Sequence, residues 1–214
     1  MLRFFTSREL SDRLSVAPAK WKRWSREFLP PDPLGGWQSG VARQFSVDEA
    51  LTVFMGGYLV AELTYGIPAA RQILSDLHHC LLRIGFFASG RSDQPFLSGA
   101  TDPIREYALR IYRDRQSAVG AARFSYLLRG SISGTSEETK GRRVTTDRYI
   151  EELILPSPTS VPQRLSHRTL NLSALSDFFA TALGLDKGHF PILYERRRVP
   201  VEQGREVLRR QGAK

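Results

Sequence analysis

Cysteine is almost absent from this chain, since Cys80 is the single one among 214 residues. One thiol excludes both an intramolecular disulfide framework and a metal site built from several thiolates of one chain. Long apolar runs are also missing, and no stretch approaches the roughly 20 residues needed to cross a bilayer. The first residues, MLRFFTSREL, lack the apolar segment of a signal peptide. We therefore expect a soluble cytoplasmic protein with no membrane partner.

Patterns that would point to catalysis or to a cofactor are equally scarce. His78, His79 and Cys80 are adjacent, and neighbouring helical positions diverge by about 100°, so these three side chains cannot converge on one metal ion. Gly130–Gly134 reads GSISG, which has Ile132 where a nucleophile elbow needs its serine, and we expect a flexible hairpin loop there. The sequence contains no glycine-rich nucleotide loop. We therefore predict no enzyme activity, no cofactor and no metal site.

The positive charge lies at the two ends of the chain. The protein carries 31 basic and 22 acidic residues, a formal net charge of +9. Residues 1–45 contain eight basic and four acidic residues, residues 46–186 fifteen of each, and residues 187–214 eight and three. A basic excess confined to the ends indicates a polyanionic partner, with a merely solvated basic tail as the alternative.

The first half of the chain reads as four helices. Thr6 and Glu9 have capping-box spacing before a short helix, and Pro18 suits the first turn of a second helix ending near Phe28. A proline- and glycine-rich segment follows, with a short extended or hairpin piece around 37–45. Ser46 and Glu49 form a second capping box. The helix that it opens ends near Gly66, and a fourth runs over 68–84.

The second half alternates apolar and polar residues with period two. This favours three antiparallel strands, around 107–112, 124–128 and 144–155, with a helix as the alternative for the first. Residues 130–143 are expected to be a polar loop. Leu170 and Leu172 suggest a fourth short strand, Ser173 is expected to cap a helix through Leu183, and Gly184 to end it.

The order of the first elements indicates a helix-turn-helix, in which the second helix lies in the major groove of DNA. Four basic side chains on that helix are long enough to reach phosphates or guanine edges: Lys20, Lys22, Arg23 and Arg26. Trp21 is expected to anchor the helix or to contact DNA, and Trp24 to lie in the core or on a sugar–phosphate strand.

The residues also resemble a known family. The segment from Val16 to Trp24, VAPAKWKRW, is similar to the second helix of MerR-type winged helix-turn-helix proteins, and Gly40–Ala50, GVARQFSVDEA, is similar to the end of their wing and the capped helix after it. The resemblance covers about residues 4–84. It implies that Arg43, Gln44 and Phe45 clamp the DNA backbone. The long dimerisation helix of the family is interrupted here by Gly90, Pro95 and Gly99.

We therefore expect an α+β protein with an N-terminal winged helix-turn-helix, mostly helical, followed by a C-terminal α+β module with a small antiparallel sheet. The expected parts are a DNA-binding domain (1–85), a linker (86–103), a module for dimerisation or for binding an effector or partner (104–190) and a basic tail (191–214). Arg196, Arg197 and Arg198 in the tail are candidate accessory phosphate contacts.

The predicted function is sequence-specific binding of double-stranded DNA as a transcriptional regulator, by a homodimer at the nucleoid. RNA polymerase is a further candidate partner, and a small-molecule effector is left unspecified. A close alternative is an architectural factor of a phage or mobile element, similar to an excisionase or a terminase small subunit. A DNA-targeted enzyme and an interaction scaffold, each using the C-terminal module, are the alternatives from other classes.

Overall fold

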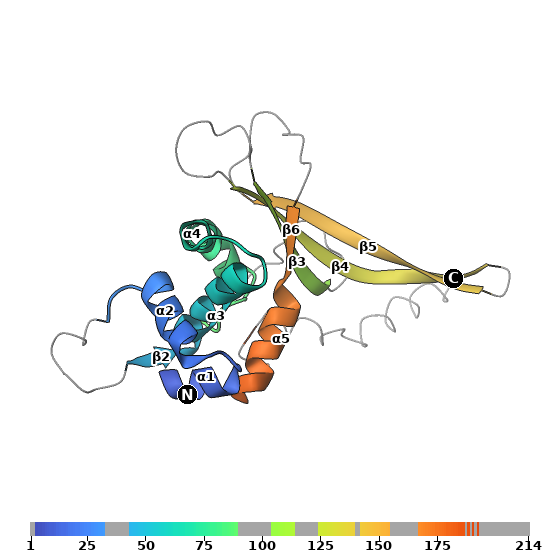
Figure 1. Cartoon of the computed structure of the whole chain (residues 1–214). Helices are drawn as coiled ribbons and strands as arrows, with labels where there is room; N and C mark the ends of the chain where they lie inside the picture. The colour runs from blue at the N-terminus through green and yellow to red at the C-terminus, as the bar shows by residue number, and fades with distance from the viewer. Residues whose placement is uncertain are drawn as a thin grey trace, which may run out of the picture.

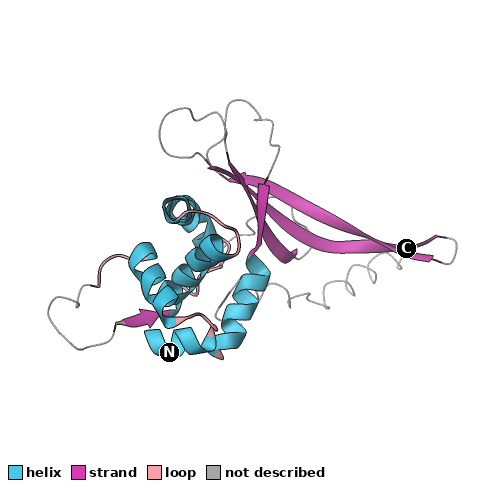
Figure 2. Cartoon of the chain, viewed as in Figure 1, coloured by secondary structure: helices cyan, strands magenta, loops and turns pink. Residues whose placement is uncertain are grey.

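The structure is a computed structural model that describes residues 3–32, 43–89, 104–113, 124–139, 142–154, 167–186, 188, 190 and 192. These residues form five helices and two antiparallel sheets, a mixed α+β fold (Figure 2). The helices are α1 (Ser7–Arg13), α2 (Pro18–Phe28), α3 (Val47–Ala61), α4 (Ile67–Arg83) and α5 (Leu172–Leu183). The strands are β1 (Phe4–Thr6), β2 (Gln44–Ser46), β3 (Ile104–Arg113), β4 (Phe124–Thr139), β5 (Arg142–Ile154) and β6 (His167–Asn171). Within this part of the chain no helix is both long and apolar enough to cross a membrane.

The starts of the first helices follow from local signals. Thr6 and Glu9 form a full capping box at α1, and Ser46 and Glu49 form another at α3. Each satisfies backbone N–H groups that a helix start leaves without partners. Pro18 occupies the first turn of α2, where its missing N–H is no loss. These predicted boundaries are confirmed.

A two-stranded sheet closes the N-terminal part of the chain. β1 pairs with β2 in antiparallel register, with Phe5 opposite Phe45. Strand β1 was not predicted, because three residues are too few to show a period. Most of the expected wing, residues 33–42, lies outside the described residues. The sheet therefore brings the start of the chain beside the residues that lead into α3.

The larger sheet has the strand order β5-β4-β3-β6, antiparallel throughout. The expectation of strands in this half is confirmed, and the helical alternative around 107–112 is wrong. The polar loop predicted for 130–143 is also wrong, because β4 continues to Thr139 and β5 begins at Arg142. Beyond Ile132 β4 pairs with β5 alone. In Figure 1 this two-stranded hairpin extends away from the helices.

The junction of β6 and α5 differs from the prediction in one residue. Asn171 caps α5, and its side-chain oxygen accepts the N–H of Ala174 at 2.9 Å. Ser173, which was expected to be the cap, is buried, and its hydroxyl instead accepts the backbone N–H of Tyr107 on β3 at 2.9 Å. The predicted stop is confirmed, because Gly184 ends α5 in the left-handed conformation with φ 61°.

The helices and the larger sheet share one contiguous apolar core. Phe86 and Phe87, in the segment expected to be a linker, are buried in it. Tyr65, which follows α3, meets Phe124 of β4 edge to face at 5.8 Å, and Phe54 of α3 contacts Phe179 of α5 at the same distance. Figure 1 shows α5 leading from the sheet back to α1 and α3. The buried side chains of α2 are therefore part of a core to which both halves of the chain contribute.

Candidate nucleic-acid interface

The turn before α2 is short and held by the backbone. The N–H of Val16 donates to the carbonyl of Ser11 at 3.0 Å, and Ser15 takes a positive φ of 54°. Only a minority of residues other than glycine adopt that conformation. Because α2 begins at Pro18, directly after this turn, its direction relative to α1 is set by a few local contacts.

The inner face of α2 is formed by two tryptophans. Trp21 is fully buried and meets the ring of Phe45 edge to face, with 5.9 Å between ring centroids. Trp24 retains 8% of its surface and packs directly over Gly57 of α3. Trp21 and Trp24 were expected either in the core or on DNA, and their burial supports the core alternative. Phe45 was expected on the DNA backbone, but only 1% of its surface is exposed, and a side chain buried in the core is not available to contact a duplex.

The outer face of α2 is cationic. Lys20, Lys22, Arg23 and Arg26 are all exposed. Residues three and four apart lie side by side on a helix, so Lys22, Arg23 and Arg26 form one stripe on the face opposite the tryptophans. The Nε of Arg26 donates to the carbonyl of Lys22 at 3.3 Å, which lays this side chain along the helix surface. Lys20 lies apart from the stripe, beside a pocket between α2, α3 and α5.

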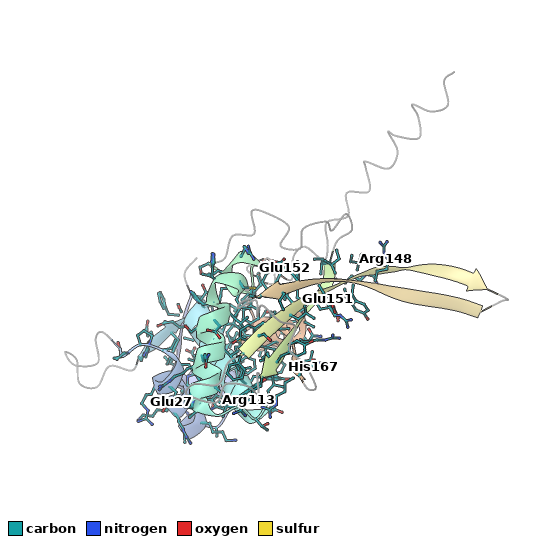
Figure 3. The ribbon with its side chains drawn as sticks, turned by 90° about the horizontal axis from the view of Figure 1, so that it is seen from above. Glu27, Arg113, Arg148, Glu151, Glu152 and His167 are labelled. Atoms are coloured by element: carbon teal, nitrogen blue, oxygen red, sulfur yellow. The ribbon has the colours of Figure 1, made fainter. Side chains whose placement is uncertain are left out.

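The single carboxylate of α2 is bound by another helix. Glu27 forms an ion pair with Arg71 of α4, and the Nε of Arg71 also donates to the Glu27 carbonyl at 2.6 Å. Figure 3 places Glu27 on the helical body, away from Glu151 and Glu152 of β5 in the larger sheet. Since Arg71 balances this carboxylate, the four basic side chains of α2 keep their excess of positive charge at the surface.

Of the residues expected to clamp the DNA backbone, Arg43 has a structural role here. Its guanidinium donates to the carbonyl of Pro30 at 3.0 Å and to Glu49 at 3.1 Å, and it lies over the Phe45 ring at 5.4 Å. It therefore holds together the two ends of the segment 33–42 and the start of α3. Gln44 is exposed next to it. Arg196, Arg197 and Arg198 lie outside the described residues.

Metal-ligating side chains do not gather anywhere in the described ranges, in which no three His, Cys, Asp or Glu side chains could hold one ion. His78 and His79 are exposed, whereas Cys80 is buried on the other side of α4. Burial raises the pKa of the Cys80 thiol to about 12, which disfavours the thiolate that a metal site would need.

The sequence interpretation missed the pocket beside Lys20. Its walls come from segments far apart in the chain, so no local motif marks it. The one available signal was the pair Gly56-Gly57 inside an apolar helix, because two adjacent glycines there indicate a close approach by another element.

Comparison with known proteins adds no relative. No protein-family model, curated protein or solved structure matches this chain.

Proposed function

We propose that this protein binds double-stranded DNA in a sequence-specific manner through α2, as a transcriptional regulator. The observation that supports it best is the exposed stripe of Lys22, Arg23 and Arg26 on a helix whose opposite face is buried. An α-helix with its side chains is about 10–12 Å across, which suits a major groove about 12 Å wide. Arginine and lysine on such a helix can bind guanine edges as well as phosphates.

The finer architecture belongs to the same proposal. We infer a winged helix-turn-helix of MerR-like type, in which α1 and α2 form the helix-turn-helix and the segment before β2 is the wing. The short turn between α1 and α2, the β1–β2 pairing and the capped α3 support it. In this arrangement Arg43 and Gln44 lie where the wing joins β2, and the contacts of Arg43 with Pro30 and Glu49 tie that junction to α3.

Two further properties follow from the mode of binding. Regulators of this kind read two half-sites about one helical turn apart, so we propose a homodimer on an approximately palindromic site. Such a protein acts at the nucleoid in the cytoplasm and performs no chemistry. Phosphate contacts dominate the affinity of such complexes, so binding is expected to weaken steeply with salt.

The test is a binding assay with duplexes selected from a random library, read by fluorescence anisotropy at several salt concentrations. The test variant replaces Lys22, Arg23 and Arg26 by Gln. A matched control replaces three exposed arginines of α4 and β3 by Gln, and so loses the same net charge: Arg83, Arg105 and Arg113. Figure 3 shows Arg113 beside His167, at the sheet.

The α2 variant should lose about 1–3 kcal/mol of binding free energy for each side chain that reads a base. Its salt slope should fall by about 0.9 for each lost phosphate contact, and the control should bind almost as the unmodified protein does. If the unmodified protein selects no duplex at low salt, the proposed function is wrong. Equal losses in both variants would show that α2 is not the reading helix.

A further inference from the structure

A pocket of about 440 Å³ lies behind α2, where three helices and a turn meet. This volume is within the range of about 300–1,000 Å³ that is typical of small-molecule sites. Its walls come from the α1–α2 turn, from α2 and α3, and from α5, which follows the larger sheet. Molecules bound there would touch both the helix proposed to read DNA and the C-terminal half.

The interior of the pocket is aromatic. Trp24 and Phe54 line it, together with Tyr58 and Phe178. The ring of Phe178 is 51% exposed and stacks on Phe54 at 5.8 Å, with only 15° between the ring planes. Such a large exposed ring in a fixed orientation provides a flat wall for another aromatic ring. Gly57 also lines the pocket, and its missing side chain leaves room for Trp24.

The rim of the pocket carries charges of both signs. Lys20, in the first turn of α2, and Glu62, at the end of α3, both line it. Within the described part of the chain neither side chain forms a hydrogen bond or an ion pair, and they do not pair with each other. Each side chain also lies near a helix end whose dipole favours the same ligand charge as the side chain does. The start of α2, with Lys20, favours an anion, and the end of α3, with Glu62, favours a cation.

We propose that this pocket binds a small aromatic zwitterion of the amino-acid class. The aromatic ring stacks on the exposed ring of Phe178, against the wall that Trp24 lines, while the carboxylate faces Lys20 and the ammonium faces Glu62. A site with a positive and a negative rim charge favours a ligand that carries both a carboxylate and an ammonium. A ligand with only one of these groups would leave either Lys20 or Glu62 desolvated and without an opposite charge.

The site also gives a route to regulation, and this step rests on the proposed function. A ligand that contacts α2 and α5 together favours one placement of α2 relative to the sheet. Saturating ligand should then change the affinity for DNA, while an unchanged affinity would exclude a regulatory role. Ligand binding itself is measured without DNA, so a failure of the DNA proposal and a failure of the pocket proposal give different results.

The probes are L-tryptophan, tryptamine, which lacks the carboxylate, indole-3-propionate, which lacks the ammonium, and indole. Binding to the full chain is measured by titration calorimetry and by saturation-transfer NMR. We expect L-tryptophan to bind with a Kd below about 1 mM and tryptamine and indole-3-propionate to bind about tenfold more weakly. If none of the four shows saturable binding in this range, the proposal is wrong.

Three variants locate the ligand. Phe178→Ala should weaken L-tryptophan binding about tenfold, whereas Phe4→Ala, a control at an aromatic side chain of equal exposure, should leave it unchanged. Lys20→Gln should abolish the preference for L-tryptophan over tryptamine, and Glu62→Gln the preference over indole-3-propionate. Equal binding by the Phe178 and Phe4 variants, or preferences unaffected by Lys20→Gln and Glu62→Gln, would place the ligand elsewhere and overturn the proposal.

Discussion

Gly57 of α3 lies so close beneath the indole of Trp24 that a methyl group added to it would overlap three carbon atoms of the ring. Gly56 next to it stands in a similar relationship to Phe28, whose Cδ2 would be 2.5 Å from an added Cβ. Two glycines thus let α2 approach α3 with its aromatic side chains between the helix axes. This contact sets the position of the cationic helix face.

Gly57→Ala should destabilise the protein, because the core around a rigid indole cannot take an extra methyl group without strain. We expect a loss of about 1–3 kcal/mol in the free energy of unfolding, measured by urea denaturation. In a Trp24→Leu background the same substitution should cost at least about 1 kcal/mol less, because the two positions are in contact. Strict additivity of the two substitutions would contradict the close approach.

A hydrogen bond between α4 and β4 should contribute to stability. The hydroxyl of Tyr126 donates to Oδ2 of Asp76 at 2.6 Å. Burial, and then this hydrogen bond, raise the pKa of the Tyr126 hydroxyl. Tyr126→Phe should cost about 1.5–3 kcal/mol, the usual range for a hydrogen bond to a charged group. In an Asp76→Ala background the cost should be clearly smaller, and an equal cost would show that the loss comes from packing.

Cys80 should be inert in the folded protein. It retains 6% of its surface, and burial raises its pKa to about 12. At pH 8 only about one thiol in 10,000 is then a thiolate, and the thiolate is the nucleophile. Iodoacetamide should therefore leave the native protein unlabelled over a period in which the urea-unfolded chain is fully labelled, as mass spectrometry would show. Rapid labelling of the native protein would contradict the burial of α4 at this position.

The capping box of α1 predicts a pH dependence. Hydrogen bonds from the backbone N–H and the hydroxyl of Thr6 lower the pKa of Glu9. A carboxyl whose pKa is lower in the folded state stabilises that state above its unfolded pKa, about 4.3, and loses this contribution as the pH falls through its folded pKa. Thermal unfolding should show that Glu9→Gln reduces stability at pH 7 and that the difference from the unmodified protein shrinks below about pH 4.3. A constant difference from pH 7 to strongly acidic pH would exclude this role for the Glu9 charge.

We expect Arg43 to contribute to the stability of the fold. Arg43→Ala removes the hydrogen bonds to Pro30 and Glu49 and should cost about 1–2 kcal/mol in the free energy of unfolding. Gln44→Ala, at the exposed neighbouring position, is the matched control and should stay within about 0.5 kcal/mol of the unmodified protein. Equal stabilities of the two variants would show that the Arg43 contacts do not hold β2 in place.

The helix boundaries could be predicted where the signal is local. A cap such as Thr6 with Glu9, or the proline at the start of α2, acts within about one turn, so the residue types and their spacing suffice. The exposed basic stripe of α2 follows from the same reasoning, because helical periodicity assigns Lys22, Arg23 and Arg26 to one face. The alternation in the second half likewise indicated strands before any partner was known.

The predictions that were wrong concern residues whose structure depends on a contact with a distant part of the sequence. Residues 130–139 look like a loop in isolation, but pairing with β5 makes them a strand. Serine is a common helix cap, but the hydroxyl of Ser173 accepts the backbone N–H of Tyr107, and Asn171 caps α5 instead. Phe45 was expected on the DNA backbone, but the ring of Trp21 covers it.

Cys80, the single cysteine of the chain, shows the same difference between features that the sequence determines locally and features that depend on the tertiary structure. The sequence by itself determined that the chain has no disulfide framework, where α1, α2 and α3 begin and that α5 ends at Gly184, because these features depend on residue counts or on contacts within a few positions. Only the tertiary structure decided that this thiol is buried, that Arg43 bonds Pro30 and Glu49, and that Lys20 and Glu62 share the rim of an aromatic pocket. Burial and pocket formation depend on segments more than a hundred residues apart, such as Trp24 and Phe178, and only folding brings them together.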